Sequence, residues 1–180
     1  MNRDSNLRAL GISGSLLKAS FNTGLLRAGR EIAPAGMELT IFDINDLPFY
    51  NGDVEAQGDP AAVVALKSAI RDAHGVVFAT PEYNWGTSGA LKNAIKWASR
   101  DREERSLMGK PATIIGAGGR VGTARAQMQL LETLGETGQL PALVAVWGPN
   151  IFISVVALWA VRRVARQGPL DIFGQIGSVK

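Results

Sequence analysis

Three stretches of this 180-residue chain combine polar, aromatic and glycine residues in patterns that suit ligand binding. The first, residues 13–22, holds serine hydroxyls, an amide and a lysine. The second, residues 81–87, places two aromatic rings beside small residues, and the third, residues 116–123, is rich in glycine. Each follows an apolar run typical of a buried strand and precedes a helical pattern, so each is expected to join a strand to a helix.

The first loop is suited to a phosphate group. Backbone N–H groups at a helix N-terminus, the helix dipole and nearby hydroxyls together bind a phosphate dianion. The candidate donors are Ser15, Ser20 and Asn22, with Lys18 as a nearby positive charge. An ordinary capped loop is the competing interpretation, because Ser and Asn are common N-caps in loops that bind nothing.

The third loop imitates a dinucleotide fingerprint but does not match it. The pattern Gly116-x-Gly118-x-x-x-Gly122 has one residue too many before its last glycine. It also follows the fourth expected strand rather than the first, and no clear ribose-binding acid comes after it. These glycines are better explained as a loop whose backbone N–H groups approach the edge of a flat ligand.

Hydrolytic and metal chemistry find no support in the sequence. Ser13 and Ser15 lie in G-I-S-G-S, whereas a nucleophile elbow requires G-x-S-x-G. The only histidine, His74, precedes its strand, so a parallel sheet places it at the edge opposite to Ser13. The chain has no cysteine, which excludes disulfides, thiolate nucleophiles and cysteine metal sites. We therefore predict no catalytic side chain and no metal, and instead a cofactor that brings its own reactivity.

Hydrophobic periodicity predicts alternating strands and helices. The expected strands are 7–12, 38–43, 76–79, 111–115 and 143–147, and the expected helices are 23–33, one starting at Pro60, one capped by Ser88, and 124–137. This order predicts an α/β fold with a doubly wound, five-stranded parallel sheet in a three-layer α/β/α sandwich. The loops after the first, third and fourth strands then leave from one edge of the sheet, where such folds bind ligands.

Composition and charge indicate one cytoplasmic domain. Apolar residues make up 46% of the chain, enough for a full core. The net charge of +3 lies entirely in residues 151–180, and the first 150 residues carry 15 basic and 15 acidic side chains. Without a basic groove, no nucleic-acid partner is expected. The polar N-terminus lacks a signal-peptide core, and the apolar run 151–161 is too short to span a bilayer, so that run is expected to be a packed helix.

In order and content, the three loops resemble the motifs of the NADPH-dependent FMN reductases, a family of flavodoxin-like quinone, chromate and azo reductases. Residues 14–22, G-S-L-L-K-A-S-F-N, resemble the family's G-S-L-R-K-x-S-x-N phosphate loop. P-E-Y-N at 81–84, followed by L-K-N-A-I-K-W at 91–97, resembles its P-E-Y-N-x-S-x-P-G-x-L-K-N-A-I-D-W signature. Residues 118–127, G-G-R-V-G-T-A-R-A-Q, are similar to its third glycine loop. The resemblance covers roughly residues 7–147 of one flavodoxin-like domain, 1–180, in which 148–180 diverge.

The resemblance implies an FMN cofactor that takes a hydride from NADPH or NADH at flavin N5. Electrons then pass to a small acceptor on the same ring face, such as a quinone, azo or nitro compound, chromate or free flavin. The implied cofactor-binding residues surround the phosphate, the flavin ring and its pyrimidine edge: Ser13, Ser15, Leu17, Lys18, Ser20, Asn22, Pro81, Glu82, Tyr83, Asn84, Trp85, Ala117, Gly118 and Gly119. Arg120 and Arg100 are candidates for the nicotinamide nucleotide or the substrate. Family members are commonly homodimers or homotetramers.

The chain departs from the family pattern at three places. Leu17 replaces the usual arginine of the phosphate loop, which removes a charge-assisted donor and predicts weaker or more salt-sensitive FMN binding. Residues 86–88 replace a turn that contains proline, and beyond Trp147 the match ends. Two alternatives therefore stay open: a flavodoxin-like electron carrier without nicotinamide activity, and a non-enzymatic scaffold that binds flavin weakly or not at all.

Overall fold

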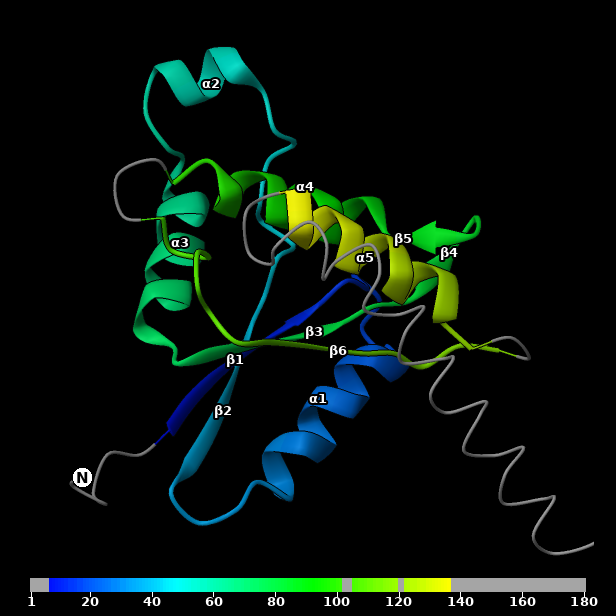
Figure 1. The fold of residues 1–180 in the computed structure, drawn as a ribbon. Coiled ribbons are helices and arrows are strands. Elements are labelled where there is room, and N and C mark those ends of the chain that lie inside the picture. The colour runs from blue at the N-terminus through cyan, green and yellow to red at the C-terminus, as the bar shows by residue number, and fades with distance from the viewer. Residues whose placement is uncertain (1–6, 102–104, 120–121, 137–180) are drawn as a thin grey trace, which may run out of the picture.

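A computed structural model describes residues 7–101, 105–119 and 122–136 of the chain (Figure 1). Its main sheet has four parallel strands in the order β2-β1-β3-β6. Their bounds are Leu7–Ser13 for β1, Met37–Phe42 for β2, Gly75–Ala79 for β3 and Ala112–Ile115 for β6. This arrangement confirms the predicted parallel α/β sheet for its first four strands. The expected strand 143–147 and the expected helix 151–161 lie outside the described residues.

Helices cover both faces of the sheet (Figure 1). Helix α1, Phe21–Glu31, packs on one face against β1, β2 and β3. Helices α3, Ala61–Asp72, α4, Gly89–Ser99, and α5, Ala124–Glu136, contribute to a shared core with the other face. The fully buried side chains of that core include Ile12, Phe78, Ile95 and Leu130. This packing holds the ends of the strands in place, and it therefore also sets the positions of the loops that follow them.

Helix starts follow from side-chain caps. The Ser88 hydroxyl accepts a hydrogen bond from the Leu91 N–H at 3.1 Å, which confirms it as the N-cap of α4. Helix α1 starts at Phe21, two residues earlier than predicted, because Ser20 is its cap and accepts from the Thr23 N–H at 3.3 Å. Pro60 is the cap position of α3 and not its first helical residue. The predicted helices are therefore present, with shifted boundaries.

Two small elements lie in segments that the sequence predicted as loops. Helix α2, Gly52–Ala56, stands clear of the sheet (Figure 1), and the Asn51 side chain caps it. Strands β4, Glu82–Tyr83, and β5, Gly86–Thr87, form an antiparallel hairpin. Its two turn residues, Asn84 and Trp85, have φ angles of 48° and 69°, values that an Asn-Gly turn normally supplies. Sequence analysis did not predict this hairpin, because Trp85 occupies the turn position where glycine is usual.

The structure confirms that His74 is an exposed residue at a strand start. Its Nδ1 accepts a hydrogen bond from the Arg8 N–H at 2.9 Å, at the amino ends of the strands. Ser13 pairs with Ala79 at the carboxyl ends, so a Ser–His pair is absent here. In the described part of the chain, no helix has the length and apolar character needed to cross a membrane.

Candidate functional site

The three polar loops meet at the carboxyl edge of the sheet, as the sequence predicted. Backbone hydrogen bonds join them: Gly14 N–H donates to Ala79 O at 2.8 Å, and Thr80 N–H donates to Ile115 O at 2.9 Å. The Ser88 hydroxyl also donates to Gly14 O at 2.6 Å, which ties the start of α4 to the first loop. The edge is therefore a connected unit with three loops in fixed positions.

In the first loop, the buried hydroxyls hold the loop in shape. Ser13 Oγ accepts from the Ser15 N–H at 3.3 Å and from Thr23 Oγ at 2.9 Å. Ser20 caps α1. This hydroxyl satisfies only the Thr23 N–H, and the N–H groups before it have no intrahelical acceptor, so they are available to an anion such as phosphate. Lys18 is exposed beside it. The loop fits a phosphate dianion through backbone donors and one cation.

Asn22 links the first loop to the third. Its side chain is only 4% exposed. Its Nδ2 donates to Ala117 O at 3.2 Å, and its Oδ1 accepts from the Ala117 N–H at 2.9 Å. This paired bond fixes the spacing of two loops whose residues are 95 positions apart. The sequence predicted Asn22 as a phosphate donor, and the structure adds a positioning role that no local pattern reveals.

The second loop is fastened to α5. The Glu82 carboxylate accepts from the Arg125 and Ala126 N–H groups at 3.0 and 3.3 Å, so it caps this helix from a distant part of the chain. The Thr87 N–H donates to Gln129 Oε1 at 2.9 Å. The Arg125 guanidinium stacks on the Trp85 ring, 3.7 Å from its centroid. Sequence analysis missed these bonds, because each joins residues more than 35 positions apart.

These bonds divide the predicted ring-binding residues into two groups. Pro81 is buried, and most of the Glu82 side chain is directed to α5. Tyr83, Asn84 and Trp85 are exposed at the hairpin tip, and 71% of Trp85 is accessible. The exposed aromatic rings, rather than Pro81 or Glu82, are therefore the surface available to a planar ligand.

The glycines of the third loop serve two different purposes. A Cβ at Gly116 would lie 2.6 Å from the carbonyl oxygen of Thr80, and one at Gly118 would lie 2.3 Å from that of Gly122. Both glycines therefore allow close backbone packing. A Cβ at Gly119 would meet nothing within 4 Å, so this exposed residue leaves room for a ligand edge. We therefore expect a ligand to contact this loop at its tip, at Gly119.

The structure does not bring Arg100 to this edge. It is the C-cap residue of α4, whose N-cap Ser88 lies at the loops, about 18 Å away for a helix of this length. Its guanidinium pairs with Glu55 at 3.1 Å and lies over the Tyr50 ring. The hydrogen bond from Arg100 to Glu55 raises the pKa of the guanidinium above its ordinary value. The other arginine candidate, Arg120, lies outside the described residues.

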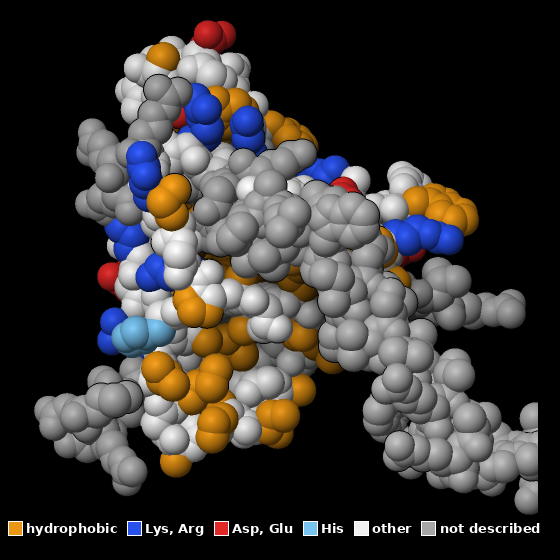
Figure 2. Space-filling model, in the orientation of Figure 1, with side chains coloured by type: hydrophobic (Ala, Val, Ile, Leu, Met, Phe, Trp, Pro, Cys, Tyr) orange, Lys and Arg blue, Asp and Glu red, His pale blue; other side chains and the backbone are white. Residues whose placement is uncertain are grey.

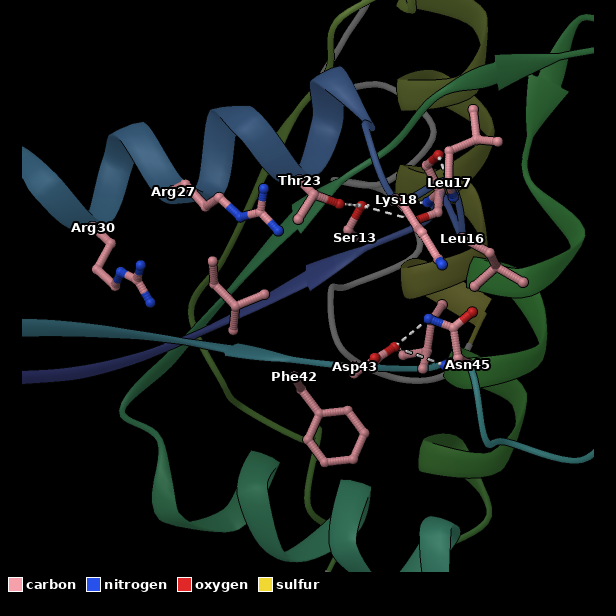
Figure 3. A pocket seen from close by; sticks show the side chains of 13 residues that line it. Ser13, Leu16, Leu17, Lys18, Thr23, Arg27, Arg30, Phe42, Asp43 and Asn45 are labelled. Carbon is pink, nitrogen blue, oxygen red and sulfur yellow. Dashed lines mark hydrogen bonds between the residues drawn. The ribbon is translucent and has the colours of Figure 1, made fainter.

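A cavity of about 490 Å³ opens beside the first loop (Figure 3). It lies between that loop, α1 and the carboxyl end of β2. Ser13, Ser15 and Lys18 line it on the loop side, and Asp43 and Asn45 line it beyond β2. The first loop therefore borders a space larger than one phosphate group requires.

Comparisons with known proteins agree with this geometry. The model of the NADPH-dependent FMN reductase family matches residues 7–149. An NAD(P)H-dependent FMN reductase of Pseudomonas aeruginosa is 49% identical over 130 residues, 72% of this chain and 70% of that protein. A quinone reductase of Escherichia coli K12 is 45% identical over 131 residues, 71% of this chain and 69% of that protein. The structure of a flavoenzyme NAD(P)H:(acceptor) oxidoreductase from Paracoccus denitrificans superposes with a TM-score of 0.68 at 38% identity, covering 73% and 72% of the two chains.

Proposed function

This chain belongs to the NADPH-dependent FMN reductase family, and from that premise we propose that it is an FMN-dependent NAD(P)H oxidoreductase. FMN is its cofactor, NADPH or NADH is the hydride donor, and quinones or similar small molecules are the acceptors. Relatives named FMN reductase and quinone reductase, at 49% and 45% identity, support this assignment.

One observation carries the proposal: the Asn22–Ala117 bonds hold the N-terminus of α1 at a fixed distance from the open tip of the third loop. The first element suits the flavin phosphate, and the open tip at Gly119 suits the edge of the flavin ring. Tyr83 and Trp85 present exposed rings at the same edge of the sheet. The residues present therefore fit FMN.

FMN, when bound, supplies the redox chemistry by accepting a hydride and returning electrons to the acceptor. The chain's own residues bind the cofactor and set its orientation. The start of α1 and Lys18 neutralise the phosphate, the Asn22 tether sets the distance between the two loops, and the Glu82 cap holds the hairpin against α5. No side chain is assigned a proton-transfer role.

The test is a visible absorption spectrum of the purified protein, before and after FMN is added and the protein is desalted. We expect flavin bands to remain, to bleach anaerobically with NADPH or NADH, and to return when a quinone is added. Absence of retained flavin at low salt would contradict the cofactor assignment. Retained flavin that neither nucleotide reduces would instead support an electron carrier.

We further propose that the chain forms a single domain that acts in the cytoplasm as a homodimer or homotetramer, without nucleic-acid or membrane partners. The balanced charge of the first 150 residues supports the first of these exclusions. Light scattering coupled to gel filtration measures the assembly directly. A monomeric mass across the micromolar concentration range would overturn the oligomer proposal.

Replacing Leu17 with arginine is expected to tighten FMN binding about tenfold at low salt. Leu17 is 67% exposed in the phosphate loop, so an arginine there reaches the dianion without displacing a packed side chain, and a charge-assisted bond of that kind contributes about 1.5–3 kcal/mol before solvent screening. The measurement is FMN fluorescence quenching in 20 and 300 mM NaCl.

The Leu17→Gln variant is the matched control, since it has a polar side chain without the charge and is expected to change the FMN dissociation constant little. Because salt screens exposed charges, the gain from Leu17→Arg is expected to shrink at 300 mM NaCl. An unchanged FMN affinity in Leu17→Arg at both salt concentrations would show that the loop needs no second cation.

A further inference from the structure

The positive charge that lines the cavity beside the first loop extends beyond that loop to α1. Its lining includes three cationic side chains, Lys18, Arg27 and Arg30, and one carboxylate, Asp43 (Figure 3). The Asp43 carboxylate already accepts two hydrogen bonds from Asn45, at 2.9 and 2.6 Å. The cavity therefore has two more cations than carboxylates in its lining, and two of its three cations belong to α1 rather than to the first loop.

The two arginines come from one face of α1. They are three residues apart, which places them side by side on the helix surface. In Figure 3 both extend from α1 into the space between this helix and β2, while Lys18 extends from the first loop toward Asn45. Within the described residues, neither arginine forms a side-chain hydrogen bond or an ion pair. Unpaired guanidinium groups around a cavity are the arrangement that binds phosphate.

One end of this cavity is formed by the first loop, where the flavin phosphate is expected, and the other end, at the two arginines, lies beyond that position. Arg27 and Arg30 lie in the second and third turns of α1, whereas the flavin phosphate is expected at the first turn. Ser13, Ser15 and Lys18 line the side that the two regions share. A ligand in the cavity therefore lies next to bound FMN, beyond its phosphate.

A dinucleotide is long enough to reach the arginine end of the cavity. NADPH contains one nucleotide more than FMN, so when its nicotinamide lies over the flavin ring, its adenosine half can extend past the flavin phosphate. NADPH differs from NADH only by a phosphate on the adenosine 2′-hydroxyl. In doubly wound folds that bind dinucleotides, a nearby arginine accommodates that phosphate, and here the arginines that line the cavity belong to α1.

We propose that the cavity binds the 2′-phosphorylated adenosine of NADPH, and that Arg27 and Arg30 make the enzyme prefer NADPH to NADH. This inference rests on the proposed function and names its hydride donor. Asp43, the residue after β2, also lines the cavity, so the proposal requires the 2′-phosphate to lie against the arginines and away from this carboxylate. The two arginines are specificity-determining residues and take no part in hydride transfer.

The test is calorimetric binding to the FMN-loaded protein of two probes, adenosine 2′,5′-bisphosphate and adenosine 5′-monophosphate. Loading with FMN occupies the flavin phosphate position first. The wild type is expected to bind the bisphosphate about tenfold or more tightly than the monophosphate, since the extra dianion meets two guanidinium groups. The Arg27→Ala/Arg30→Ala variant is expected to lose most of that difference, and its KM for NADPH is expected to rise relative to its KM for NADH.

The matched control is Arg8→Ala/Lys96→Ala, which removes the same charge from residues that do not line the cavity. It is expected to bind both probes as the wild type does. Equal binding of the two probes by the wild type would overturn the proposal. An equal loss in the control would also overturn it, because the effect would then come from net charge.

The same experiments separate this proposal from other sources of an adenosine phosphate. FAD carries an adenylate beyond its first phosphate, so FAD is titrated into the flavin-free protein alongside FMN. If FAD binds more tightly than FMN and loses that advantage in Arg27→Ala/Arg30→Ala, the cavity belongs to the flavin and the proposal is wrong. If the protein retains no FMN, the two probes are titrated into the flavin-free protein, and a preference for the bisphosphate there would refute the proposed function but not the nucleotide cavity.

Discussion

The Gly116→Ala variant is expected to unfold about 2–3 kcal/mol more easily than the wild type and to lose most of its FMN affinity. A Cβ at this position would lie 2.6 Å from the Thr80 carbonyl oxygen and 2.1 Å from Thr123 Oγ. The threonine side chain can rotate, but the Thr80 carbonyl belongs to the backbone at the end of β3. The third loop must therefore move away from that strand, at the cost typical of an overpacked interior position.

The expected loss of FMN affinity follows from the same displacement. Ala117, the next residue, is bonded to Asn22 through both its N–H and its carbonyl. A shift of the loop stretches these bonds and changes the distance between the phosphate loop and the edge of the flavin ring. Urea denaturation measures the stability change, and fluorescence quenching measures the FMN dissociation constant.

Gly119→Ala is the matched comparison, because the same substitution three residues later has open space around it. We expect its free energy of unfolding to equal that of the wild type within about 0.5 kcal/mol. Its FMN affinity is expected to fall, since the new methyl group occupies the place of the flavin edge. If Gly116→Ala is as stable as Gly119→Ala, the third loop does not pack against the end of β3 as closely as in this structure.

The sequence was sufficient to predict the four described strands of the sheet because their signals are local. The apolar runs at β1, β3 and β6 are bounded by glycine or proline, and the Ser88 cap lies immediately before its helix. The convergence of three loops followed from the parallel order alone. Local patterns of this kind decide which segments are strands, and topology then places their ends.

What the sequence could not predict depends on contacts between distant residues. The Glu82 carboxylate caps α5 from 43 positions away, so no N-terminal pattern of that helix reveals it. Arg100 was a plausible nucleotide ligand by residue type, yet Glu55 in α2 holds it at the far end of α4. Figure 2 shows how blue side chains of this kind gather on several parts of the surface, which is why residue type alone does not identify a binding site.

The Asn22→Ala variant is expected to lower the free energy of unfolding by about 2 kcal/mol and to weaken FMN binding at least tenfold. The substitution removes both hydrogen bonds to Ala117, and a partly buried backbone group that loses its partner costs about 1–3 kcal/mol. Because those bonds are the direct link between the phosphate loop and the glycine loop, the spacing between the two loops is no longer fixed. Thermal unfolding without FMN isolates the stability effect from the binding effect.

The Asn22→Asp variant separates the positioning role of Asn22 from contact with the phosphate. Its carboxylate retains an acceptor for the Ala117 N–H but places negative charge beside the Ala117 carbonyl and the start of α1. If Asn22 lies against the flavin phosphate, like-charge repulsion makes Asn22→Asp the weaker FMN binder of the two variants, although it keeps one of the two bonds. If the side chain only tethers the loops, Asn22→Asp binds FMN more tightly than Asn22→Ala, and the phosphate contact implied by the family resemblance is refuted.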